Sequence, residues 1–174
     1  MRRISVTGPE SAGKSTLAAE LAAHYGTVFV PEYARAYLEA NGPRYTLLDL
    51  AAIAQGQLAA EDAAAHQAAG LLLCDTDLLV IKIWAENAFG TCPAWVLADL
   101  EKPRYALTLL LAPDLPWAPD PLREHPDPAQ RWHFYNLYRA ELVSRGWPFA
   151  EISGPPAERR AQAVATIEAR LSVQ

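Results

Sequence analysis

The run Gly8-Pro9-Glu10-Ser11-Ala12-Gly13-Lys14-Ser15 decides the fold of this 174-residue chain. It matches the pattern GxxxxGK[ST], in which glycines let the backbone curl so that successive N–H groups point at phosphate oxygens. The run Ile4 to Thr7 precedes it and predicts a strand, and helix-forming residues from Lys14 to Tyr25 follow it. This order of strand, loop and helix predicts a phosphate-binding loop at the start of a parallel α/β sheet.

The loop assigns roles to its own residues. In such a loop the lysine reaches the β and γ phosphates of a nucleotide, and the hydroxyl that follows it is a ligand of Mg²⁺. We therefore expect Lys14 to act in catalysis and Ser15 to bind the metal. The residues expected to bind the nucleotide phosphates are Gly8, Glu10, Ser11, Ala12, Gly13, Lys14, Ser15 and Thr16.

Short apolar runs alternate with longer helical ones along the rest of the chain, which is typical of a parallel sheet with helices on both faces. We predict a three-layer P-loop NTPase fold of the α/β class, with a central parallel sheet of about five strands. The further strands are expected at 27–30, 71–74, 105–111 and 149–152, and the further helices at 32–41, 46–69, 78–89, 94–102, 129–145 and 157–171.

Prolines crowd the segment from about 112 to 128, so neither a helix nor an interior strand is expected there. We predict an ordered loop or a lid that excludes water from the site. Arg123 is expected to place its guanidinium on a phosphoryl group, and Asp120 to lie on the substrate side. For Trp117 two interpretations stay open, a cover for a flat ring or a side chain packed on the core.

Carboxylates follow two of the predicted strands, at the sheet edge where ligands bind in such folds. Asp75 and Asp77 come after 71–74, where an acid holds Mg²⁺, although either of them is also a suitable helix N-cap. Glu32 follows 27–30, with Arg35 one turn away, and is suited to accept a proton from an acceptor hydroxyl or to bind ribose. The alternative for that pair is a surface ion pair.

Other candidates carry weaker signals. Gln57 and Lys82 are polar residues on largely apolar helices, and each is a candidate contact for a substrate ring or phosphate. Trp84, Phe134 and Tyr138 lie on helical stretches, where packing in the core is the default expectation.

The composition limits the class of protein. A net charge of −5 argues against a protein whose main role is to bind nucleic acid or anionic membranes, and it favours small-molecule substrates. No apolar run has the roughly 20 residues that a membrane-spanning helix needs. With two cysteines and no export signal, we expect a single domain over residues 1–174 in the cytoplasm. A homo-oligomer is compatible with these features.

Several runs together resemble the ribosylnicotinamide kinase domain of NadR-type proteins. They are Gly8 to Leu17, Pro31-Glu32-Tyr33-Ala34-Arg35, Ile53-Ala54-Gln55-Gly56-Gln57, Asp75-Thr76-Asp77, Lys82-Ile83-Trp84, Pro113 to Trp117, Asp120 to Glu124, and Gly154 leading to Arg159. The resemblance covers nearly the whole chain in order. The Glu-Tyr-Ala-Arg run and the Pro-Trp-x-x-Asp-Pro-x-Arg run are its most particular parts.

The resemblance implies a kinase that uses ATP and Mg²⁺ to phosphorylate the ribose 5′-hydroxyl of nicotinamide riboside, which yields nicotinamide mononucleotide for NAD salvage. It places Glu32, Tyr33 and Arg35 on the acceptor side, Asp75 and Asp77 on the metal and sugar side, and Ser153, Gly154 and Pro155 beside the adenine. The choice of base between Glu32 and Asp75 stays open. We do not carry over the adenylyltransferase and repressor functions of fuller family members.

Two other functions use the same parts. One is a different nucleoside or nucleotide kinase, since the same machinery serves any alcohol or phosphate acceptor. The other is a switch NTPase that hydrolyses nucleotide to control a protein partner. Production of ADP that depends on an acceptor separates the kinases from the switch.

Overall fold

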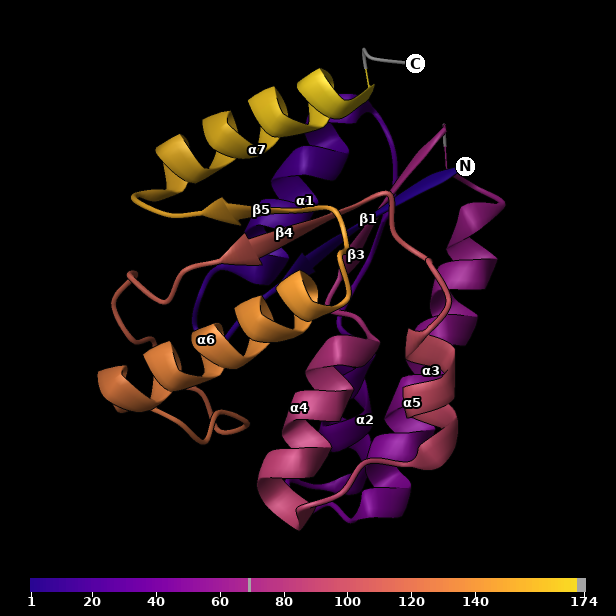
Figure 1. The fold of residues 1–174 in the computed structure, drawn as a ribbon, viewed down its shortest axis with the longest axis vertical. Coiled ribbons are helices and arrows are strands. Elements are labelled where there is room, and N and C mark those ends of the chain that lie inside the picture. The colour runs from indigo at the N-terminus through magenta and orange to yellow at the C-terminus, as the bar shows by residue number, and fades with distance from the viewer. Residues whose placement is uncertain (69, 172–174) are drawn as a thin grey trace.

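The structure, a computed structural model, describes residues 1–68 and 70–171. At its centre lies a parallel sheet of five strands in the order β2-β3-β1-β4-β5 (Figure 1). The predicted parallel α/β sheet is therefore confirmed. The strands are β1 (Arg2–Thr7), β2 (Phe29–Val30), β3 (Leu71–Asp75), β4 (Leu107–Leu111) and β5 (Phe149–Ile152), and the helices are α1 (Lys14–Tyr25), α2 (Tyr33–Asn41), α3 (Leu47–Ala65), α4 (Leu78–Phe89), α5 (Ala94–Leu100), α6 (Pro128–Ser144) and α7 (Pro156–Leu171).

The first strand is the middle of the sheet. Within β1, Ile4 pairs with Leu73 of β3 on one side and with Leu107 of β4 on the other. Since all four pairings are parallel, the carboxyl ends of the strands meet at one edge. That edge holds the loop after β1, the end of β3 and the turn after β2, which are the places where the candidate site residues lie.

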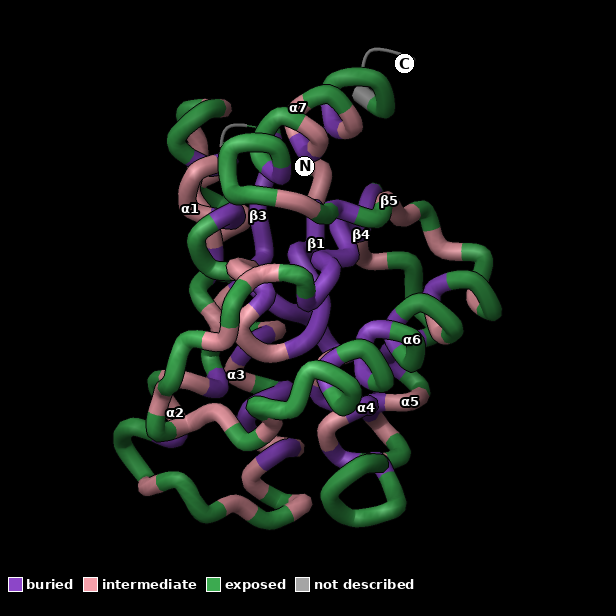
Figure 2. Tube along the Cα trace, turned by 90° about the vertical axis from the view of Figure 1, so that its left-hand side faces the viewer, coloured by how far each residue is buried: buried purple, intermediate pink, exposed green. Residues whose placement is uncertain are grey.

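Helices cover both faces of the sheet, which gives the three layers that the sequence predicts (Figure 1). On one face α1 and α7 pack on alternate residues of the strands, such as Leu73 and Leu109. On the other face α3 lies over Leu72 and Cys74, while α4 and α6 share a core with Leu110. Figure 2 shows the result, with the central strands β1, β3 and β4 largely buried and the outer faces of the helices largely exposed.

Most boundaries match the sequence prediction where a glycine marks the end. α1 and α4 have the expected bounds because Gly26 and Gly90 end them in the left-handed conformation. α3 ends at Ala65, earlier than expected, and Ala69 lies outside the described residues. β2 is shorter than expected and contains only Phe29 and Val30, while the Thr27 side chain before it donates to the Leu71 carbonyl oxygen of the neighbouring strand.

The proline-rich segment contains no helix or strand between β4 and α6, as expected. We call residues 112–127 the lid segment. In the described part of the chain, no helix is both long and apolar enough to span a bilayer.

Candidate active site

The loop after β1 adopts a conformation that only its glycines permit. Gly8 has φ +137°, and a Cβ there would lie 2.7 Å from the Leu111 carbonyl oxygen of β4. Gly13 has φ +82° and is the N-cap of α1, where no described side chain caps the helix. The first N–H groups of α1 are therefore free to bind an anion, and the positive end of the helix favours one.

Lys14 begins α1 and points back along the loop. Its Nζ donates to the Pro9 carbonyl oxygen at 2.9 Å. Its charge also acts on the carboxyls of Glu32 and Asp75, both of which it stabilises in the ionised form. The Lys14 cation therefore lies close to both the phosphate loop and the two carboxylates.

Asp75 ends β3 and is 1% exposed. Burial raises the pKa of its carboxyl, while Lys14 and a hydrogen bond from Ser15 act in the opposite direction. Its Oδ1 has no hydrogen-bond partner among the described residues. A buried carboxylate oxygen without a partner, beside a serine hydroxyl, is a donor set that suits Mg²⁺, which prefers oxygen ligands.

Glu32 lies in the turn between β2 and α2, and it faces the same space. It is the N-cap of α2, yet its side chain accepts no hydrogen bond from that helix. Burial raises the pKa of the Glu32 carboxyl, and Lys14 acts against that rise. The Glu32 carboxylate therefore lies near the phosphate loop and does not cap α2.

A cavity of about 250 Å³ opens from the phosphate loop. Its near end is polar, with Lys14, Glu32 and Arg35 in the wall. Its far end lies between α2, α4, α6 and the segment that follows α2, and its wall is made mainly of aromatic and aliphatic side chains. The far wall contains Leu38, Tyr45, Val80, Ile83, Trp84, Asn87, Phe134 and Tyr138.

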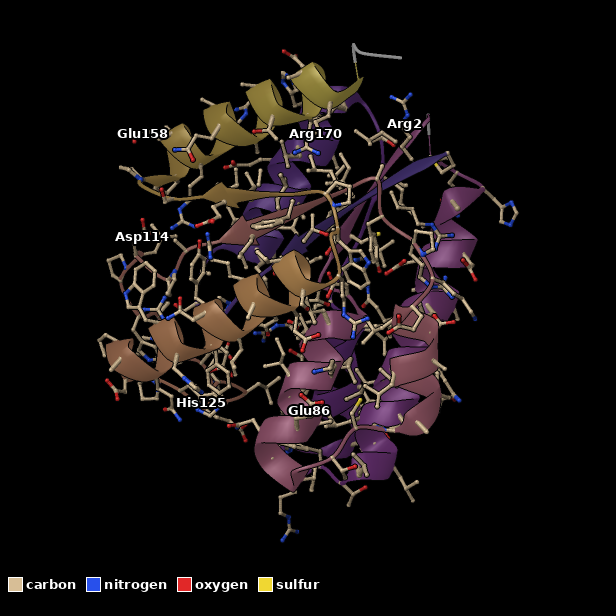
Figure 3. The ribbon with its side chains drawn as sticks, in the orientation of Figure 1. Arg2, Glu86, Asp114, His125, Glu158 and Arg170 are labelled. Atoms are coloured by element: carbon tan, nitrogen blue, oxygen red, sulfur yellow. The ribbon has the colours of Figure 1, made fainter. Side chains whose placement is uncertain are left out.

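The lid segment closes one side of this cavity. Arg123 and Glu124 line it directly, and the Tyr45 hydroxyl donates to the Glu124 carboxylate at 2.9 Å. The Trp117 ring lies near two guanidinium groups, 5.9 Å from Arg123 and 5.8 Å from Arg131. In Figure 3, Asp114 and His125, near the two ends of the segment, lie on either side of α6 in the view.

Hydrogen bonds fasten the lid segment to the phosphate loop. The Glu10 carboxylate accepts from the backbone N–H groups of Glu124, at 3.0 Å, and His125, at 2.9 Å. The Ser11 hydroxyl accepts from the Ala118 N–H. From α6, the buried Arg131 donates to the carbonyl oxygens of Glu10, Ser11 and Leu115. Loop, lid segment and α6 thus form one bonded unit.

Comparison with known protein families shows to which family the chain belongs. A family model described as an AAA domain matches residues 3–160. The chain belongs to the AAA domain family.

This AAA domain is also similar to two curated proteins named trifunctional NAD biosynthesis/regulator protein NadR, from Escherichia coli and Salmonella typhimurium. Each is 31% identical over 156 residues, which cover 87% of this chain and 38% of the relative. The chain therefore spans well under half the length of these relatives.

Solved structures share the fold of the AAA domain. A NadR protein in complex with NR has a TM-score of 0.76 at 22% identity, covering 99% of this chain and 52% of that one. A deoxyadenosine kinase from M. mycoides has a TM-score of 0.67 at 12% identity, covering 96% and 99%. The three-layer fold is therefore shared with both of these structures.

The AAA domain brings many of the predicted site residues to one cavity and leaves others outside it. The predicted residues that line the cavity are Gly8, Glu10, Ser11, Ala12, Gly13, Lys14, Ser15, Thr16, Glu32, Arg35 and Arg123. Those outside its described lining are Tyr33, Gln57, Asp75, Asp77, Lys82, Trp117, Asp120, Ser153, Gly154 and Pro155.

Several residues outside the lining have bonds within the protein. Asp77 is the N-cap of α4 and accepts from the N–H groups of Leu79 and Val80. Lys82 is paired with Glu86 and Glu141, at 2.8 Å in both cases. Arg35 and Asp120 pair with each other at 3.0 Å, which joins α2 to the lid segment.

The loop after β5 approaches the phosphate loop from outside the cavity. The Gly154 N–H donates to the Asp114 carboxylate, and the Gly154 carbonyl oxygen accepts from Arg159. Arg159 is buried and also donates to the carbonyl oxygens of Ala12 and Ala112. One side chain therefore connects three loops at the carboxyl edge of the sheet.

Sequence reasoning missed the aromatic end of the cavity. Trp84, Phe134 and Tyr138 pack in the core, as expected, and all three also line the cavity. Tyr45 was not singled out, and it contacts Trp84 edge to face at 4.7 Å. Helical periodicity gives the inward face of α4 and α6 without saying whether that face meets a core or a cavity, so no signal in one sequence separates the two.

Proposed function

We propose that this chain is a kinase that transfers the γ-phosphoryl group of ATP to the ribose 5′-hydroxyl of nicotinamide riboside. The observation that carries the proposal is that one cavity has the phosphate loop and Glu32 at one end and aromatic side chains at the other. The similarity to proteins named for NAD biosynthesis, and to a NadR structure in complex with NR, supports this acceptor.

The nucleotide phosphates would bind at the phosphate loop. The uncapped N–H groups of α1 and the Lys14 ammonium face this position, and both stabilise negative charge. Ser15 and Asp75 would hold Mg²⁺, in keeping with the unpartnered Oδ1 of Asp75. When bound, Mg²⁺ neutralises charge on the phosphates and orients them for transfer.

We assign the base to Glu32. Its carboxylate lines the cavity, whereas Asp75 lies behind Ser15 and outside the cavity lining. Because burial raises the pKa of Glu32, the carboxylate has an increased affinity for a proton from a substrate hydroxyl. The roles of the two carboxylates then differ: Glu32 accepts the proton and Asp75 binds the metal.

Arg123 would stabilise the phosphoryl group during transfer, because it lines the cavity from the lid segment. The closed lid segment keeps water away from the phosphate loop, which favours transfer to the nucleoside over hydrolysis. Trp117 lies near Arg123 and Arg131, and in this proposal it supports the lid segment from outside the cavity lining.

The aromatic end would hold the base of the acceptor. The pyridinium ring of nicotinamide riboside carries a positive charge, and the faces of aromatic rings attract cations. Tyr45, Trp84 and Glu124 form a part of the wall that combines aromatic faces with a carboxylate. A neutral purine or pyrimidine has no positive charge for these aromatic faces and this carboxylate to attract.

We further propose that residues 1–174 act as one kinase domain with the lid segment as its cover. A cytoplasmic location supplies ATP and suits Cys74 and Cys92, which are both free and buried. Small-molecule substrates, and neither nucleic acid nor membrane, are its proposed partners.

The test is release of ADP from ATP and Mg²⁺ without an acceptor, with nicotinamide riboside, and with a panel of ordinary nucleosides. We expect strong stimulation by nicotinamide riboside alone and its loss in Lys14→Ala, by about 100-fold or more, the scale found when one charge-stabilising group is removed. Stimulation by another nucleoside would keep the kinase and replace the acceptor. Turnover that does not depend on an acceptor would instead indicate a switch NTPase.

A further inference from the structure

The start of α2 is capped from a neighbouring helix. The first N–H groups of a helix have no partners within the helix, and the N-cap side chain or another nearby acceptor satisfies them. Here the N-cap is Glu32, and its carboxylate makes no such bond. A second side chain takes over part of that task.

That side chain is Gln57 of α3. Its Oε1 accepts from the Tyr33 N–H, the first of α2, at 3.0 Å. Gln57 is only 3% exposed, whereas Tyr33 reaches the surface, so it is the accepting amide that is held away from water. Replacing Gln57 by an apolar side chain removes this partner of the Tyr33 N–H.

The orientation of the Gln57 amide is fixed from its other end. Its Nε2 donates to the Glu61 carboxylate at 3.4 Å, one turn further along α3. Glu61 is 0% exposed and also accepts from the Tyr105 hydroxyl, at 2.8 Å, and from Arg3, at 3.2 Å. This chain of bonds leaves Oε1 as the end of the amide that faces α2.

The neighbouring residue brings the two helices together. A Cβ on Gly56 would lie 2.1 Å from Cε1 of the Tyr33 ring, so only glycine allows the ring to rest on α3 at this point. Gly56 and Gln57 thus hold the side chain and the backbone of the same residue, Tyr33. The residue before it is Glu32.

We propose that Gln57 is a positioning residue: by binding the first N–H of α2 it fixes the backbone from which Glu32 projects, and so holds the Glu32 carboxylate towards the phosphate loop. The proposal rests on the function proposed above, in which Glu32 is the base. It replaces the expectation that Gln57 contacts substrate, since Gln57 does not line the cavity. In this role Gln57 changes the rate of transfer and not the binding of ATP.

The test compares Gln57→Met, which removes both hydrogen bonds with little change in volume, with Gln55→Ala, a matched control. Gln55 lies on the same helix and is exposed. In Q57M we expect kcat to fall by about 100-fold, as for a misplaced catalytic group, with KM for ATP unchanged. Gly56→Ala, which displaces Tyr33 by another route, is expected to lower kcat in the same selective way. Q55A is expected to behave as wild type.

Two measurements test the cap without relying on activity. Hydrogen exchange of the Tyr33 amide is expected to be slow in the wild type and faster in Q57M. A crystal structure of Q57M is expected to show the start of α2, and with it the Glu32 carboxylate, displaced from the phosphate loop. A folded Q57M with full kcat, or with Tyr33 exchange as in the wild type, would overturn the proposal. If the wild type has no kinase activity, only the proposed function is refuted. The hydrogen exchange of Tyr33 and the crystal structure of Q57M still test whether Gln57 caps α2.

Discussion

At the scale of single residues, the burial of the two carboxylates beside Lys14 lowers the stability of the folded protein. Asp75 is buried with one oxygen unpartnered, and burial raises the pKa of both Asp75 and Glu32. A carboxylate in that position destabilises the free protein, since its charge has lost the solvation it has in the unfolded chain. Such a cost is expected where a metal or a proton is to be bound.

Asp75→Asn is expected to raise the stability of the protein and to lower its activity. It removes the buried charge, so the free energy of unfolding of the ligand-free protein should rise by about 1 kcal/mol, the scale of one unsatisfied buried group. The pKa of Asp75 is raised in the folded state, so the native carboxyl holds its proton more tightly than the unfolded one. The gain from D75N therefore grows as the pH rises above the ordinary value of 3.8.

Urea unfolding at several pH values measures that gain, and ADP release is expected to fall by about 100-fold or more. A D75N protein that is less stable than the wild type at neutral pH would contradict this account of Asp75.

At the scale of elements, the lid segment is held by the loop that it covers. The Glu10 carboxylate is negative and lies in a phosphate loop, where it would repel a nucleotide if it were free. Instead it accepts two N–H groups of the lid segment, next to Arg123. Glu10, which the loop motif places beside the nucleotide, therefore binds the lid segment through its side chain.

Glu10→Ala is expected to loosen the cover and let water compete with the acceptor. The share of ATP that is hydrolysed without phosphorylation of nucleoside should rise severalfold, while Glu20→Ala on α1 should leave that share unchanged. The ratio of ADP to phosphorylated nucleoside measures the effect. An unchanged ratio in E10A would show that the Glu10 contacts do not keep the lid segment closed.

At the scale of the whole molecule, Arg159 joins three loops that come from distant parts of the chain. It is buried, and it pairs with Asp114 besides its bonds to three carbonyl oxygens. Removing one partner from a buried charged network typically costs about 3–5 kcal/mol. We expect Arg159→Met to lower the free energy of unfolding by that amount in urea titrations.

The neighbouring Arg160 provides the control for that measurement, because it is exposed and Arg160→Met should have little effect. Asp114→Asn should cost less than R159M, since Asp114 is partly exposed and keeps an acceptor oxygen. If R159M and R160M were equally stable, the three loops would not depend on Arg159.

The sequence predicted the elements better than the contacts between them. Glycines at 26 and 90 fixed the ends of α1 and α4, and the motif at 8–15 fixed the loop between β1 and α1. The acids after β2 and β3 could be placed at one edge because parallel strands end together. The roles of Gln57 and Arg159 could not be foreseen, because their partners are backbone groups brought close only by the tertiary fold.

The central position of β1 also determines when the chain can fold during synthesis. β1 is translated before its two neighbours in the sheet, β3 and β4. Arg2 therefore cannot form its strand pairing until Leu71 has been synthesised, and Ile4 cannot pair with β4 until Leu107 has been synthesised. Contacts between such distant residues form slowly, because a long loop must close before they add stability. We therefore expect the nascent chain to stay unfolded on the ribosome until β4 has emerged, with its first strand exposed to chaperones in the meantime.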